Sequence, residues 1–126
     1  GVFSDINMLH AKSKSGVAQT AFGDFPSPGL PDGTTVEIVT RPQDIALELD
    51  RNGKGPNPTQ SHGAAVRGRV RRARYMGNES LVEFVMDHDG SVFKATVPAV
   101  FLPRPDSTMW LMVRRDRCFI FPTEPA

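Results

Sequence analysis

The residues best suited to binding chemistry are a run of arginines in the second half of the 126-residue chain. From position 66 to 75 the order Val-Arg-Gly-Arg-Val-Arg-Arg-Ala-Arg-Tyr places a guanidinium at nearly every second residue. Guanidinium groups bind phosphate and carboxylate oxygens through paired hydrogen bonds, and an aromatic ring can stack on a base. The run therefore predicts an anion or nucleic-acid contact made by Arg67, Arg69, Arg71, Arg72, Arg74 and Tyr75.

The charge balance favours a simpler interpretation of the same run. The chain has 15 Lys and Arg against 14 Asp and Glu, a formal net charge of +1, which is too balanced for binding driven by bulk charge. The basic excess lies in the second half, where ten basic residues from Gly63 onward face seven acidic ones. A solvated strand face whose arginines pair with Glu79, Glu83 or Asp116 is the favoured alternative, because surface ion pairs of this kind are common.

Catalytic and metal-binding patterns are absent from the sequence. His10, His62 and His88 lie in no nucleophile–base or HExxH pattern, and there is no CxxC pair and no GxxxxGK[ST] phosphate loop. The Asp87-His88-Asp89 run contains metal-ligand types, but adjacent residues of an extended chain point to opposite sides. A lone Cys118 within an apolar run predicts a small buried side chain and excludes an internal disulfide. We expect no catalytic residue, no metal and no cofactor in this chain.

The elements that position these residues are predicted to be short strands. Eleven Gly and eleven Pro break the chain frequently and leave little room for long helices. The stretch 87–90 predicts a hairpin turn in which Gly90 supplies a positive φ. Short helical turns are expected at 2–9 and at 42–45, where Pro suits a first helical position. Alternating or continuously apolar runs predict strands at 35–39, 66–75, 81–86, 93–97, 109–113 and 118–121.

The arginine strand changes phase along its length. Val66, Gly68 and Val70 share one face, whereas Ala73 and Tyr75 have the opposite parity. One extra residue near Arg71-Arg72, a β-bulge, would return both sets to the core. Strands that bend in this way are common in small barrels, so the fold class predicted is all-β, an OB-like barrel with short helical turns.

One domain is expected over residues 1–126. It divides into first strands and a turn (1–49), a polar linker (50–63) and main barrel strands (64–122). The longest strictly apolar run, 84–86, is far shorter than the ~20 residues of a membrane-spanning helix, and residues 1–5 do not resemble a signal peptide. Because the sequence begins with Gly1 rather than Met, we expect a processed chain or part of a longer one. A single cysteine favours a reducing cytoplasm.

Three segments carry a recognisable family pattern. Residues 2–9 read Val-Phe-Ser-Asp-Ile-Asn-Met-Leu, residues 36–47 read Val-Glu-Ile-Val-Thr-Arg-Pro-Gln-Asp-Ile-Ala-Leu, and residues 68–84 begin Gly-Arg-Val and continue through Tyr75-Met-Gly. In order and spacing they resemble the F-x-G-x-x-N-x-L, V-x-I-x-x-R-P-E-D-I-x-L and G-x-V-x-x-x-x-Y-x-G segments of ATP-binding subunits of bacterial ABC importers. Ser4 stands where that family usually has Gly, and Gln43 where it has Glu.

The resemblance implies an OB-like TOBE domain that ends such a subunit, closest in style to ferric-iron or polyamine importers. It implies a non-catalytic regulatory or dimerisation role, with ATP and magnesium bound in a preceding domain. The partners implied are a second copy and, through the parent protein, membrane permease subunits at the cytoplasmic side of the inner membrane. Independently of the family, Arg41, Pro42 and Asp44 are predicted to fix the turn that follows the strand at 36–39, because Asp44 can pair with Arg41 or with backbone donors.

A self-interface is predicted from apolar side chains near the end of the chain, because aromatic and methionine residues are enriched at interfaces. The alternative is that Trp110 and Met112 simply complete a small core. Two other functions stay open: an OB-type nucleic-acid module that uses the arginine run, and a small-anion or metal sensor within the barrel. The predicted interface residues are Phe101, Leu102, Met109, Trp110 and Met112.

Overall fold

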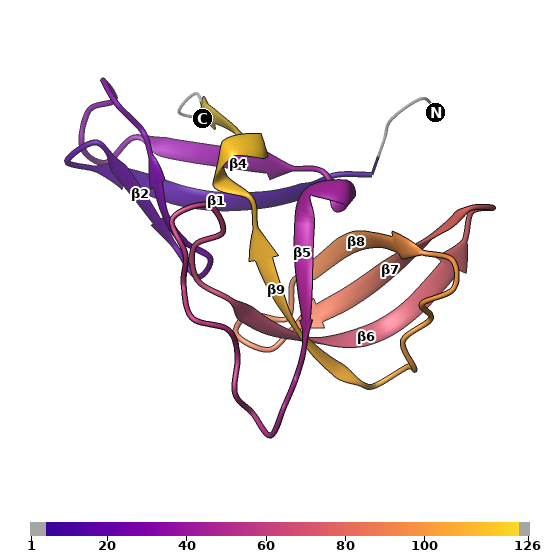
Figure 1. Ribbon diagram of the computed structural model, residues 1–126. Coiled ribbons are helices and arrows are strands. Elements are labelled where there is room, and N and C mark those ends of the chain that lie inside the picture. The colour runs from indigo at the N-terminus through magenta and orange to yellow at the C-terminus, as the bar shows by residue number, and fades with distance from the viewer. Residues whose placement is uncertain (1–4, 124–126) are drawn as a thin grey trace.

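Two five-stranded antiparallel sheets make up the computed structural model, which describes residues 5–123 (Figure 1). The first sheet has the strand order β10-β4-β1-β2-β3 and the second β5-β9-β6-β7-β8. The strands of the first sheet are β1 (Asn7–Lys14), β2 (Val17–Thr20), β3 (Gly23–Pro26), β4 (Thr35–Thr40) and β10 (Phe119–Pro122). Those of the second are β5 (Ile45–Leu49), β6 (Val66–Tyr75), β7 (Glu79–Met86), β8 (Val92–Pro98) and β9 (Thr108–Val113).

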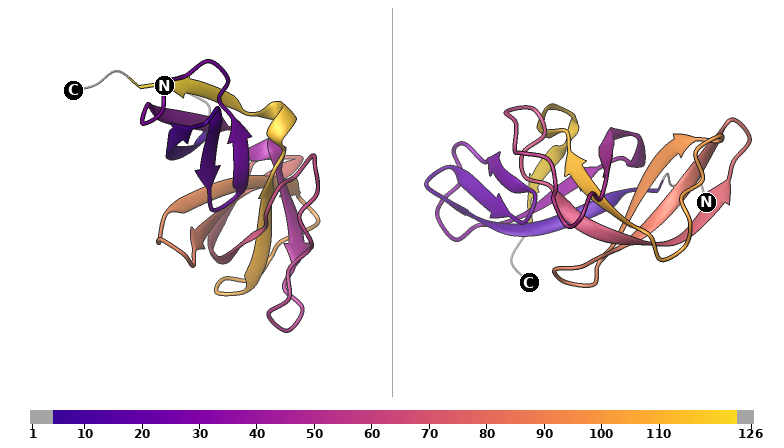
Figure 2. Two further views of the ribbon diagram at one scale, coloured as in Figure 1. Left: turned by 90° about the vertical axis from the view of Figure 1, so that its left-hand side faces the viewer. Right: turned by 60° about the horizontal axis from the view of Figure 1, so that its bottom comes forward.

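The two sheets form two layers that share one hydrophobic core (Figure 2). Phe22 and Phe25 from the β2–β3 region meet Phe93 of β8 and the buried residues of β4, β6, β7 and β9. The chain passes between the sheets twice, since β5 joins the second sheet and β10 returns to pair with β4. The all-β, OB-like prediction is therefore confirmed, with helix limited to the 3₁₀ turns η1 (Pro42–Asp44) and η2 (Arg115–Arg117) among the described residues.

Most predicted strands lie within a residue or two of their expected positions. The hairpin prediction is confirmed, because β7 and β8 pair in antiparallel register and Gly90 has φ +74° in the turn between them. The predicted turn at 42–45 is η1, in which the Asp44 N–H donates to the Arg41 carbonyl at 2.9 Å. No helix in the part of the chain from 5 to 123 is long and apolar enough to span a membrane.

The helical turn predicted at 2–9 is wrong where it can be compared with the structure. Positions 1–4 lie outside the described residues, and Asn7 begins strand β1, which pairs with β4 from Asn7↔Thr40 to Lys12↔Thr35. Pairing along six residues gives the backbone a ladder of hydrogen bonds that a single helical turn could not match.

The predicted bulge in β6 is confirmed, because the register with β7 shifts between Val70 and Arg72. Its expected consequence is wrong: Ala73 and Tyr75 remain exposed, Tyr75 to 68%. β9 pairs only with Val66–Arg69, so the rest of β6 has β7 as its one strand neighbour within the described chain. Ala73 and Tyr75 do point toward the core side with Val82 and Ser80 of β7, but nothing described covers them there.

Candidate functional site

The arginines of β6 are positioned by the bulge. A bulge places two residues of one strand opposite one residue of its neighbour. Arg71 and Arg72, although adjacent in sequence, consequently both reach Glu83 of β7: their Nε atoms lie 4.0 Å and 2.9 Å from its carboxylate oxygens. The favoured alternative, pairing with nearby carboxylates, therefore describes these two residues, with Glu83 as the shared partner.

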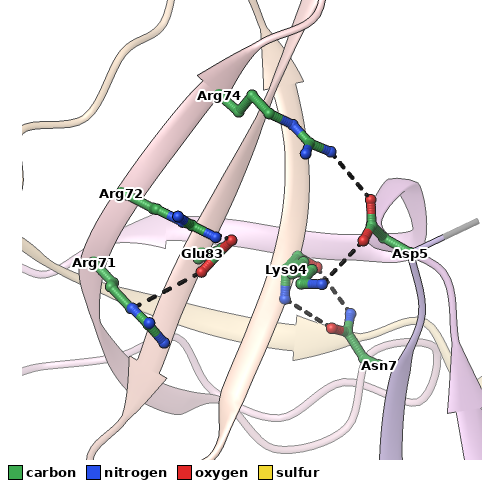
Figure 3. A network of polar contacts seen from close by, with 7 residues as sticks. All are labelled: Asp5, Asn7, Arg71, Arg72, Arg74, Glu83 and Lys94. Carbon is green, nitrogen blue, oxygen red and sulfur yellow. Dashed lines mark hydrogen bonds and ion pairs between the residues drawn. The ribbon is translucent and has the colours of Figure 1, made fainter.

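Charges of alternating sign follow one another across the sheet, with ion pairs at the two ends of the row (Figure 3). Register places Arg72, Glu83 and Lys94 side by side on β6, β7 and β8. The Lys94 ammonium then lies 3.0 Å from the Asp5 carboxylate, whose other oxygen is 3.5 Å from Arg74. We call Arg72, Glu83, Lys94 and Asp5 the charge ladder. The Lys94 hydrogen bond, helped by the charges of Lys94 and Arg74, lowers the pKa of Asp5 even though burial opposes it.

The ladder and its flanking arginines still carry an excess of positive charge. Among the described residues, Arg71, Arg72, Arg74 and Lys94 share only the two carboxylates of Asp5 and Glu83. The group is therefore two positive charges in excess, and three of its guanidinium groups are more than half exposed. Exposed pairs of this kind stabilise a fold by only a few tenths of a kcal/mol each, so their guanidinium groups can exchange partners.

Asn7 joins the first sheet to the edge of β8. Its side-chain amide donates to the Lys94 carbonyl at 2.8 Å and accepts from the Lys94 N–H at 2.7 Å, as a neighbouring strand would. The residue is 2% exposed, so the contact is largely shielded from water. Asp5, Asn7 and Lys94 were missed by the sequence reasoning, since no pattern connects residues 87 positions apart.

Arg67 lies away from the ladder and has its own carboxylates. Its guanidinium is 2.7 Å from Asp87 and 3.6 Å from Asp50. Asp50 also accepts hydrogen bonds from Thr108 at 2.7 Å and from the Trp110 indole at 3.0 Å. These bonds, the one from Thr108 foremost, lower the pKa of Asp50, so this carboxylate organises the start of β9 and is not free to bind a ligand.

Arg69 has no ion-pair partner among residues 5–123. It borders a cleft of about 500 Å³ together with Arg71, Asp87 and Asp106. Two guanidinium groups against two carboxylates leave this cleft without a preference for an anion. No group of three His, Cys, Asp or Glu side chains within the described range is placed to hold a metal ion.

The predicted interface residues divide into two groups. Met109 and Met112 are buried at 3% and 7% exposure, so the expectation that they add exposed apolar area is wrong: Met109 lies in the core shared by the sheets, and Met112, of opposite parity, is covered on the other face of β9. Trp110 is half-buried beneath the 50–58 loop, where a Cβ on Gly55 would lie 2.6 Å from its ring. Phe101 and Leu102 are exposed on the loop between β8 and β9. An interface at these last two residues stays a prediction.

The family is decided by a match that covers most of this architecture. The model of the TOBE domain matches residues 31–121, from the turn before β4 into β10. The chain belongs to the TOBE domain family. No curated protein sequence matches it.

A similar fold is seen in a solved structure of the cytoplasmic molybdate-binding protein ModG with molybdate bound. The two folds superpose with a TM-score of 0.69 over 93% of this chain and 96% of that one, at 11% sequence identity. At this identity the likeness concerns the fold.

Within the TOBE match, the Arg41-Pro42-Gln43-Asp44 segment forms the turn between β4 and β5. The Arg41 Nε lies 2.9 Å from the Asp44 carboxylate, and Asp44 is buried. The Asp44 carbonyl accepts from the Arg114 N–H at 3.3 Å, which connects the turn to the end of β9. These residues thus direct the chain from the first sheet to the second.

Proposed function

We propose that the chain is a non-catalytic regulatory and dimerisation domain of the ATP-binding subunit of an ABC importer for ferric iron or a similar small solute. The observation that carries the proposal is the TOBE match over residues 31–121, together with the segment at 36–47 that resembles those subunits. In this role the domain binds neither ATP nor magnesium, pairs with a second copy and works at the cytoplasmic face of the inner membrane beside the permease subunits.

Dimerisation gives the proposal a direct test. Sedimentation velocity of the 126-residue chain at 5–200 μM (about the range that separates weak from stable dimers) should show a shift from monomer to dimer. Leu102→Ser on the exposed loop should weaken the dimer, whereas Arg117→Gln on η2 should leave it unchanged. A chain that stays monomeric at the highest concentration would count against the dimerisation role.

A second candidate is binding of a small oxyanion. It is supported by the fold shared with ModG, solved with molybdate bound, and by the positive excess around Arg71, Arg72 and Arg74. Titration calorimetry with molybdate, sulfate and phosphate would show saturable heat if this candidate holds. Flat traces with all three anions at millimolar concentration would remove it.

The nucleic-acid alternative is less well supported by the geometry. Four of the five arginines in the run have carboxylate partners, and Tyr75 is the one aromatic residue in the run. Binding of a single-stranded oligonucleotide would be strongly salt-dependent. A constant polarisation of a labelled twenty-nucleotide oligodeoxythymidine at low salt would exclude it.

A further inference from the structure

The outer half of β6 has a strand edge with which no described strand pairs, although the β8–β9 loop passes it between its hydrogen bonds to Asn78 and Val70. β9 pairs with β6 only as far as Arg69, and the loop before β9 hydrogen-bonds to it only at Val70, through Asp106 and Ser107. From Arg71 to Tyr75 the strand pairs on one side, with β7, and all five residues are exposed. Figure 1 shows β6 and β7 running together to a turn at the margin of the molecule.

The backbone direction at this edge follows from the hairpin geometry. The Met76 N–H donates to the Glu79 carbonyl at 2.8 Å, so Met76 points its backbone groups toward β7. Alternate residues of an antiparallel strand point to the same side, which directs the amide and carbonyl groups of Ala73 and Tyr75 to the open edge. An exposed edge with such unpaired groups is a template for one more strand.

The side chains at the edge specify the chemistry of that strand. Arg72 and Arg74 lie on the outer face, within the group that is two positive charges in excess. Ala73 and Tyr75 lie on the other face and are uncovered. An added strand would alternate in the same way, with acidic side chains beside the arginines and apolar ones beside Ala73 and Tyr75.

The apolar surface continues beyond the strand. The Ala99 N–H donates to the Asn78 carbonyl at 3.4 Å, which places the start of the β8–β9 loop against the β6–β7 turn. That loop presents Val100 at 95% exposure. Exposed apolar side chains grouped next to an unpaired, positively charged edge are typical of a protein-binding site.

We propose that the β6 edge from Arg71 to Tyr75 binds an extended segment of a partner protein in which acidic and apolar residues alternate, by adding it to the second sheet as a sixth strand. A polypeptide fits better than a nucleic acid, because the edge offers main-chain hydrogen bonds and aliphatic surface but a single stacking ring. This inference rests on the proposed regulatory function and specifies the regulator as a protein with an extended acidic and apolar segment. The dimer measurement does not depend on it, so either can fail alone.

The test uses a fluorescein-labelled ten-residue peptide that alternates Glu with Val and Ile, titrated with the 126-residue chain. Polarisation should rise and saturate, and a peptide with Lys in place of each Glu should not bind. Ala73→Pro should abolish binding, because it removes an outward N–H that no described group accepts, and proline is tolerated on edge strands. The double variant Arg72→Gln/Arg74→Gln should weaken binding about tenfold, as expected for two lost charge contacts.

Arg117→Gln serves as the matched control, since this exposed arginine lies on η2, and it should bind like the unchanged chain. Circular dichroism establishes whether each variant is folded. If Ala73→Pro is unfolded, the peptide affinity of the double arginine variant tests the proposal. Absence of binding by the acidic peptide, equal binding by the lysine peptide, or unchanged affinity in the folded variants would overturn the proposal. Preferential binding of the labelled oligodeoxythymidine, weakened by the arginine variant, would assign the surface to nucleic acid instead.

Discussion

Replacing Asn7 with alanine tests whether one side chain holds the two sheets together. The substitution removes both hydrogen bonds to the Lys94 peptide group, at 2.8 and 2.7 Å, and leaves that N–H and carbonyl without their partner. Each bond contributes about 1 kcal/mol net, and the partly buried groups left behind cost about 1 kcal/mol more. We therefore expect the free energy of unfolding to fall by about 2–3 kcal/mol, a decrease in Tm of about 8–12 °C for a chain of this size.

Urea denaturation followed by circular dichroism measures this loss, provided that the m-value is unchanged and the transition stays two-state. Asn78→Ala is the matched control, because Asn78 lies exposed in the β6–β7 turn and should change stability by less than about 0.5 kcal/mol. If Asn7→Ala unfolds at the same urea concentration as Asn78→Ala, the amide bridge contributes nothing and our account of how the sheets are joined is wrong.

Three further outcomes follow from the same contacts. Gly55→Ala should destabilise the chain by about 1–3 kcal/mol and change Trp110 fluorescence, because a Cβ at position 55 would lie 2.6 Å from the indole ring of Trp110. The folded state lowers the pKa of Asp50, so the ionised carboxylate stabilises the fold above its ordinary pKa, and this stability is lost as the pH falls below it. In the Asp50→Asn variant, the free energy of unfolding should therefore depend less on pH below about pH 4. Glu83→Gln should cost less than about 1 kcal/mol in urea denaturation, since its partners Arg71 and Arg72 are exposed, and a larger loss would show that the charge ladder is a main structural support.

Local sequence patterns predicted the structure correctly where core positions are apolar and the interacting residues are close in sequence. The alternation at 93–97, the turn at Gly90 and the parity change in β6 each report a feature decided by a few consecutive residues. Strand β1 was missed because the buried residues at its two ends are polar. The Asn7 amide hydrogen-bonds to the Lys94 backbone at the edge of β8, and Ser13 shares a 2.6 Å hydrogen bond with Ser27. Polar residues at core positions conceal the period of two on which strand prediction depends.

The exposure of individual residues depended on strands far away in the chain. Ala73 and Tyr75 have the parity of core residues, and they would be buried if β9 extended further along β6. Met109 and Met112 lie on opposite faces of β9, between β5 and β6, and both faces are covered there by other parts of the fold. How far a neighbouring strand extends is a tertiary property, and residue types within 66–75 or 109–113 carry no information about it.

The bulge in β6 connects the two features that distinguish this surface. By placing Arg71 and Arg72 opposite Glu83, it gathers more guanidinium groups on one face than the local carboxylates can neutralise. Bulges also increase the local twist of a strand, and beyond this one β6 has no paired strand on the β9 side in the described structure. Positive charge and an open edge thus arise at the same place from one inserted residue. A deletion of Arg71 that restored regular pairing would remove one charge and the local twist of the bulge, and would leave Ala73 and Tyr75 on the same face as Val70. Loss of peptide binding together with retained dimerisation in such a variant would assign the two activities to separate surfaces.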